Sequence, residues 1–176
     1  MIDTGRNWLA PGVIKHLIAG MAMLKMNVLH WHLTDDQSFP ISTSAFPELS
    51  KHTTFAPTAH YNLPDLKEIV SFAAVIMELL TECYECSIHQ LAVAHLFGQL
   101  LPTFIGVSVS CIRQERGIRV LPEIETPGHG SCRAKVVPQL NLSSCPGVLN
   151  PTLNATYDFL LTLLSEIAPV FPEPTL

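Results

Sequence analysis

Residues 28–40 read VLHWHLTDDQSFP, and this stretch carries the strongest structural signal in the chain. Residues 28–33 are rich in β-forming side chains and predict a strand. His30 and His32 alternate with apolar residues along it, and Asp35 and Asp36 follow where the strand should stop. Only 14% of the chain is charged. Four ionisable groups in seven residues therefore indicate a polar strand end that binds a ligand, unless the cluster arose by chance.

The flanking segments predict further strands and helices. Residues 1–4 and 117–125 read as strands, and the nearly continuous apolar start of the second is typical of a strand buried on both faces. A polar loop is expected over residues 35–62. Helices are expected up to Asn27, from Pro64 onward and over residues 154–171. Their predicted buried faces are Ile14, Leu17, Ile18, Met21 and Leu24; Leu66, Ile69, Val70 and Ala73; and Tyr157, Leu160, Leu161, Leu164 and Ile167.

The resulting order, β-α-β-α-β-α, predicts an α/β fold with parallel strands and crossover helices. Three such units do not close an eight-stranded barrel, and a doubly wound sheet usually has more strands. The chain therefore reads as part of a domain. An unpaired strand edge and an open apolar face would leave the chain prone to aggregate or to be molten.

Charged side chains follow each of the three predicted strands. Arg6 follows the first, Asp35 and Asp36 the second, and Glu125 and His129 the third. The carboxyl ends of parallel strands form the active face of α/β folds, so these residues are expected to share one site. The alternative is that each belongs to a solvated loop or a helix cap.

Composition excludes some classes of protein. The chain has 176 residues, a net charge of −5 and no basic cluster, so nucleic acid is not an expected partner. Residues 1–5 show no signal peptide, yet Asn141 and Asn154 both begin glycosylation sequons. The sequons indicate a secretory route and an N-terminus that is missing from this chain.

Five motifs together resemble one enzyme family. IDTGRNW, LKMNVLHWHLTDDQSFP, FPEL, GIRVLPEIETPGHG and LNPTLNATYDF are similar, in this order, to the catalytic barrel of the β-N-acetylhexosaminidases, glycoside hydrolase family 20. The resemblance covers residues 1–74 and 115–176. It implies a (β/α)8 TIM barrel that is incomplete here, with roughly the first three β/α units. It also implies an enzyme that removes terminal β-linked N-acetylhexosamine from glycans or chitin oligosaccharides, is secreted or lysosomal/vacuolar, and forms a homodimer at full length.

The resemblance also implies roles for the polar residues. Arg6 would hydrogen-bond sugar hydroxyls, and Asp35 and His129 would form a network beside the catalytic acid, with Asp36 and Glu125 adjoining it. Glu125 stands where the family mostly has Asp. His30 and His32 would have a structural role, packing and hydrogen-bonding near the strand end. The reaction is substrate-assisted and uses an Asp-Glu pair at the end of the fourth strand, without metal or cofactor. That pair would lie beyond Leu176, so the chain alone is expected to be inactive.

Residues 75–114 match nothing in the family and admit three interpretations. Val75 and Gln114 are encoded by codons that can begin with GT and end with AG, which suggests a translated intron. A second interpretation is a membrane span over residues 86–112, but histidines, glutamines and a proline interrupt it. The third is a genuine loop that is atypical of the family.

Other functions remain open at the level of sequence. The chain would be a non-catalytic sugar-binding or regulatory remnant if it truly lacks the Asp-Glu pair. His30 and His32 on one strand also resemble a metal pair of an amidohydrolase, and Cys83 and Cys86 have the spacing of half a zinc or redox site. Cys132 and Cys145 would pair with each other or with cysteines elsewhere.

Overall fold

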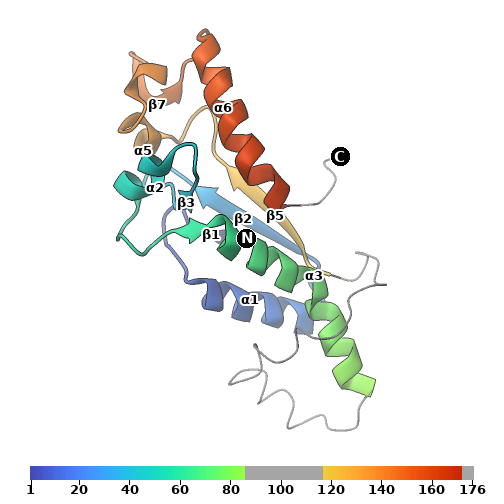
Figure 1. Cartoon of the computed structure of the whole chain (residues 1–176). Helices are drawn as coiled ribbons and strands as arrows, with labels where there is room; N and C mark the ends of the chain where they lie inside the picture. Colours follow the sequence, from blue (N-terminus) through green and yellow to red (C-terminus); the bar gives the residue numbers. More distant parts are fainter. Residues whose placement is uncertain (86–116, 172–176) are drawn as a thin grey trace.

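A three-stranded parallel sheet forms the centre of the computed structural model, which describes residues 1–85 and 117–171. The strands are β1 (Ile2–Asp3), β2 (Val28–Thr34) and β5 (Arg119–Ile124), in the order β1-β2-β5 (Figure 1). Both pairings are parallel, which confirms the prediction from the alternating pattern. The register places His32 between Asp3 of β1 and Glu123 of β5.

Two helices cover one face of this sheet. Helices α1 (Pro11–Met23) and α3 (Leu63–Glu85) run side by side (Figure 1). Leu29, Trp31 and Leu33 of β2 are buried in the same core as the inner side chains of both helices. Successive side chains of a strand point to opposite faces, so His30 and His32 lie on the other face of the sheet. This alternation places a polar layer on the face opposite the helices.

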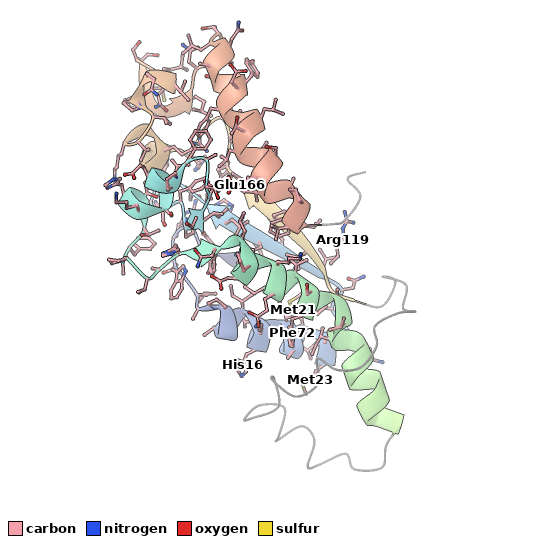
Figure 2. The ribbon with its side chains drawn as sticks, in the orientation of Figure 1. His16, Met21, Met23, Phe72, Arg119 and Glu166 are labelled. Atoms are coloured by element: carbon pink, nitrogen blue, oxygen red, sulfur yellow. The ribbon has the colours of Figure 1, made fainter. Side chains whose placement is uncertain are left out.

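The buried face of α1 differs from the predicted one. Ile14 and Ile18 are fully buried as predicted, but Leu17 and Leu24 are 43% and 71% exposed. Lys15 is buried in their place, with its Nζ bonded to Glu68 of α3. Figure 2 shows Met21 and Phe72 where α1 meets α3, and His16 and Met23 on the outer side of α1. The position of α3 and this ion pair set the rotation of α1, which helical periodicity alone does not contain.

The predicted polar loop over residues 35–62 contains regular structure. Strands β3 (Ile41–Ser42) and β4 (Tyr61–Asn62) pair in parallel, and helix α2 (Pro47–Thr53) lies between them. Pro47 occupies the start of α2 and Leu49 is fully buried, so the prediction of an unbroken loop is wrong. Helix α3 begins directly after β4 and continues past residue 74 to Glu85. The rest of the predicted insert, including the span proposed for residues 86–112, lies outside the described residues.

The chain after β5 forms small elements near the carboxyl ends of the strands and then a long helix. They are α5 (Ser131–Ala134), η2 (Pro138–Leu140), the antiparallel pair β6 (Asn141–Leu142) and β7 (Cys145–Leu149), α6 (Asn154–Ile167) and η3 (Ala168–Val170). Helix α5 contacts both α2 and β7, and Figure 1 shows these elements gathered at one end of the molecule.

Helix α6 is rotated relative to its predicted face. Tyr157, Leu161 and Leu164 are 57%, 72% and 42% exposed, and Ile167 is the one predicted residue that is fully part of the core. The helix instead buries Thr156, Phe159 and Leu163. The ring of Phe159 lies 4.7 Å from that of Phe46. Glu166 (Figure 2) accepts the backbone N–H groups of residues 44 and 45 at 2.5 and 3.1 Å. These tertiary contacts choose among several apolar faces of the helix.

The remaining sequence expectations concern cysteines and membranes. Cys132 is buried and Cys145 is exposed, and both are free thiols, so they do not pair with each other. The side chains of Cys83 and Cys86 lie outside the described part of the chain. None of the described helices is long and apolar enough to cross a membrane.

Candidate functional site

Four of the five predicted site residues meet at the carboxyl ends of β1, β2 and β5. Asp35 is at the centre with its side chain 1% exposed, and Arg6 and His129 are 45% and 58% exposed on either side of it. Asp36 is next to this group, with an oxygen 3.9 Å from His129 Nδ1. A buried carboxylate between two exposed nitrogen donors suits a ligand rich in hydroxyl groups.

Asp35 makes four polar contacts with its two carboxylate oxygens. Oδ2 lies 2.5 Å from Arg6 Nη2 and 2.7 Å from His32 Nε2. Oδ1 accepts the Asp36 backbone N–H at 2.6 Å and lies 3.3 Å from His129 Nδ1. Burial raises the pKa of Asp35, but the hydrogen bonds and the Arg6 charge lower it by more than burial raises it. The net pKa is therefore below its ordinary value. Asp35 is therefore an ionised carboxylate at neutral pH.

Arg6 is oriented by two carboxylates and keeps an open side. Its Nη1 donates to Asp3 Oδ2 at 2.7 Å, and its backbone N–H donates to Asp3 Oδ1 at 3.1 Å. The hydrogen bond to Asp3 and the nearby charge of Asp35 raise the pKa of Arg6. The two ion pairs use two of the five guanidinium N–H groups, and the side chain is 45% exposed. Gly5 permits this arrangement, because a Cβ there would lie 2.7 Å from the Asp35 backbone nitrogen.

Glu123 belongs to the same network, although the sequence reasoning passed over it. Its Oε2 lies 2.6 Å from His30 Nε2 and 2.7 Å from His32 Nδ1. The hydrogen bond from His32 lowers the pKa of Glu123, and the one from His30 adds to this. The available signal was its position two residues before Glu125, because alternate residues of a strand share one face of the sheet. Glu123 is opposite His32 in register, and both histidines hydrogen-bond its carboxylate near the strand end, in agreement with the structural role expected of them.

Glu125 lies at the border of the site. Its Oε1 is 4.0 Å from His32 Nδ1, and its backbone N–H donates to Thr34 Oγ1 at 3.2 Å. The structure therefore brings Glu125 closer to His32 than to the group around Asp35.

The loop that carries His129 is held by a buried arginine that the sequence reasoning did not single out. Arg133 is 1% exposed and donates to the carbonyls of Glu125, Pro127 and Gly128, the last two at 3.3 Å. Burial lowers the pKa of Arg133. His129 adopts a left-handed backbone with φ 47°. The three carbonyl contacts fix the loop that presents the His129 ring.

Helix α5 is tied to the same site by two further contacts. The Ser131 backbone N–H donates to Asp36 Oδ1 at 2.9 Å, and the Cys132 thiol donates to the Asp35 carbonyl at 3.1 Å. Burial raises the pKa of Cys132 to about 11, so this thiol is a hydrogen-bond donor and not a nucleophile at neutral pH.

Among the described residues, two groups of side chains have donor atoms close enough to share an ion. They are His32, Glu123 and Glu125, and Asp35, Asp36 and His129, each with donor atoms within 4.8 Å of one another. We assign neither group as a metal site, because both ring nitrogens of His32 and Nδ1 of His129 already contact carboxylates. The two sequon asparagines lie elsewhere. Asn154 is exposed, while the amide nitrogen of Asn141 donates to the Val137 carbonyl at 2.9 Å.

Known proteins match both the sequence and the fold. The sequence model of glycosyl hydrolase family 20, catalytic domain, matches residues 1–82 and 113–176. The β-hexosaminidase subunit α of Rattus norvegicus and subunit β of Homo sapiens are each 34% identical over 98% of this chain. The chain spans 27% and 25% of their lengths, about a quarter of each.

Solved structures give the same result. The chitobiase of Flavobacterium johnsoniae superposes with a TM-score of 0.68 at 27% identity, covering 98% of this chain and 21% of that one. A β-N-acetylhexosaminidase of Bacteroides fragilis superposes with a TM-score of 0.67 at 25% identity, covering 97% of this chain and 29% of that one. Sequence and fold agree, and the chain belongs to glycosyl hydrolase family 20, of whose catalytic domain it forms a part.

Proposed function

We propose that the described residues form the hydroxyl-binding part of a β-N-acetylhexosaminidase active site, within roughly the first three β/α units of a TIM barrel. The observation that carries this proposal is Arg6, which two carboxylates hold in place while its outer side stays open. A guanidinium fork held in this way suits a pair of sugar hydroxyl oxygens. Binding in a preset orientation loses less entropy than binding by a free side chain.

The proposed reaction is substrate-assisted hydrolysis of a terminal β-linked N-acetylhexosamine. The acetamido oxygen of the substrate attacks the anomeric carbon, and a glutamic acid protonates the leaving oxygen. The aspartate that precedes this glutamate orients the acetamido group. No Asp-Glu dipeptide occurs in the 176 residues. We therefore propose that this chain alone binds the sugar without hydrolysing it.

Asp35 and His129 have a supporting role in this proposal. They hold charge and hydrogen bonds beside the position of the catalytic acid, with Asp36 and Glu125 adjoining. General acid catalysis is typically worth about 10²–10⁴-fold, so the missing glutamate alone would remove most of the rate. No metal or cofactor has a part in these steps.

Substrates and location follow from the same family. We propose N-acetylhexosamine-terminated glycans or chitin oligosaccharides as substrates, in keeping with the β-hexosaminidase and chitobiase relatives. A secreted or lysosomal/vacuolar full-length protein would be in keeping with the two sequons. A homodimer is the proposed assembly at full length.

The test is sugar binding and turnover by the purified chain. We expect N-acetylglucosamine to bind weakly in saturation-transfer NMR, and Arg6→Ala to weaken binding by at least about tenfold, equal to about 1.4 kcal/mol. Lys51→Ala is the matched control, because Lys51 is 66% exposed and pairs only with Glu48 among the described residues. No hydrolysis of a fluorogenic N-acetyl-β-glucosaminide is expected.

Each result has a separate meaning. Absence of sugar binding by the wild-type chain would overturn the proposed site. Sustained turnover would overturn the requirement for the Asp-Glu pair. If the product of the longest transcript also binds without turnover, the sugar-binding remnant replaces the enzyme as the function.

A further inference from the structure

His32 makes short contacts to two different carboxylates with its two ring nitrogens. Nδ1 lies 2.7 Å from Glu123 Oε2, and Nε2 lies 2.7 Å from Asp35 Oδ2. A neutral imidazole has one N–H and one lone pair, whereas an imidazolium has two N–H groups. A lone pair directed at a carboxylate oxygen at hydrogen-bond distance is repulsive. The geometry therefore requires a proton on both nitrogens of His32, or a proton on one of the carboxylates.

The surroundings of Asp35 and Glu123 exclude the second alternative. Asp35 is already bound by the Arg6 guanidinium and by a backbone N–H, and Glu123 is bound by His30. These donors stabilise the ionised form of each carboxylate independently of His32. The pKa of Asp35 is lowered by the Asp36 backbone, His129 and Arg6 as well as by His32, and the pKa of Glu123 is lowered first by His32 and then by His30. The remaining place for the proton is the ring of His32.

The charges that face His32 favour the same assignment. Asp3 adjoins it in register from β1, Glu123 and Glu125 face it from β5 and the residue after, and Asp35 faces it from the end of β2. Two cations adjoin this group: Arg6 is bound to Asp3 and Asp35, and Arg133 interacts with Glu125. Four carboxylates against two guanidinium groups leave a negative excess that a cationic His32 reduces. Burial would lower the pKa of His32, but the hydrogen bonds to Glu123 and Asp35 raise it above its ordinary value.

We propose that His32 is a buried imidazolium at neutral pH and acts as a positioning residue that links Glu123 to Asp35 and thereby fixes the carboxylate that orients Arg6. The consequence for sugar binding rests on the proposed function, whereas the protonation of His32 does not. Since Asp35 Oδ2 contacts both His32 Nε2 and Arg6 Nη2, loss of the ring proton would leave Arg6 as the stronger of two partners. Asp35, already 2.5 Å from Arg6 Nη2, would then lose its second anchor and turn with the guanidinium, so Arg6 would lose its fixed orientation.

The first measurement is the protonation state of His32 in the 15N-labelled chain. Long-range 1H–15N correlation spectra separate an imidazolium, with two equivalent protonated nitrogens, from either neutral tautomer. We expect His32 to be doubly protonated at pH 7, above its ordinary pKa of 6.5, because its pKa is raised. One protonated and one unprotonated nitrogen at pH 7 would overturn the proposal, whether or not the chain binds sugar.

The second measurement uses a variant that keeps the shape of the site. Glu123→Gln removes one negative charge and leaves an amide in the same place, so His32 should titrate at least about one unit lower. Between pH 6 and 8, binding of N-acetylglucosamine by this variant should then weaken at least about threefold more than binding by the wild type. An unchanged His32 titration in Glu123→Gln would overturn the proposed link.

The control is another histidine that is bound to one carboxylate. His52 is 56% exposed and lies 2.5 Å from Glu48. His52→Gln should leave both the His32 spectrum and sugar binding unchanged. If His32 is doubly protonated but no sugar binds, the proposed function fails and the imidazolium stands. If sugar binds but His32 carries one ring proton, the imidazolium fails and the proposed function stands.

Discussion

Arg133→Met should destabilise the chain and loosen the loop that carries His129. The substitution keeps most of the apolar stem and removes the guanidinium, which is 1% exposed and donates to three carbonyls. A hydrogen bond from a charged donor contributes about 1.5–3 kcal/mol, and two of the three are long at 3.3 Å. The cost of burying a charge offsets part of this sum. We therefore expect a loss of about 3 kcal/mol, or about a hundredfold in the folded-to-unfolded ratio.

Urea unfolding followed by circular dichroism measures this loss. Lys135→Met is the matched control, since it removes a cation two residues away from an exposed position and should change the free energy of unfolding by less than about 0.5 kcal/mol. Sugar affinity should also fall in Arg133→Met, because His129 loses its fixed position. A difference of less than about 1 kcal/mol between the two variants would refute the assignment of Arg133 as the residue that holds the loop.

Three further predictions follow from other parts of the structure. The folded-state pKa values of Asp35 and Glu123 lie below their ordinary values of 3.8 and 4.5. The two carboxylates therefore stabilise the fold fully above those values, and this stabilisation is lost as pH falls through the lowered pKa values. The free energy of unfolding in urea should decline below about pH 4.5, and Asp35→Asn should flatten that decline. Gly117→Ala should lower the free energy of unfolding by about 2 kcal/mol, because its Cβ would lie 2.3 Å from a backbone oxygen of α3. Gly12→Ala is the control and should not destabilise the chain, because the space at its Cβ is open. Equal melting temperatures for the two variants would contradict this. Leu161→Lys should reduce self-association in light scattering, because Leu161 is 72% exposed on α6, and unchanged scattering would show that this face is not involved.

The sequence by itself determined the order and direction of the three central strands and the gathering of charge at their ends. Short β-forming runs and the helices between them are local properties of the chain, and their alternating order suffices to predict a parallel sheet. Parallel strands all end at the same edge. Arg6, Asp35 and His129, which are far apart in the sequence, therefore had to approach one another once that topology was inferred.

Only the tertiary structure decided which helix faces are buried and which residues hold the site together. Helices α1 and α6 carry apolar side chains on several faces, and long-range contacts such as Lys15 with Glu68 and Glu166 with the segment before α2 select one of them. Periodicity contains no information about such partners. The double contact of His32 and the three carbonyls of Arg133 depend in the same way on register and loop shape, because hydrogen bonds need atoms within about 3 Å that the sequence leaves many residues apart.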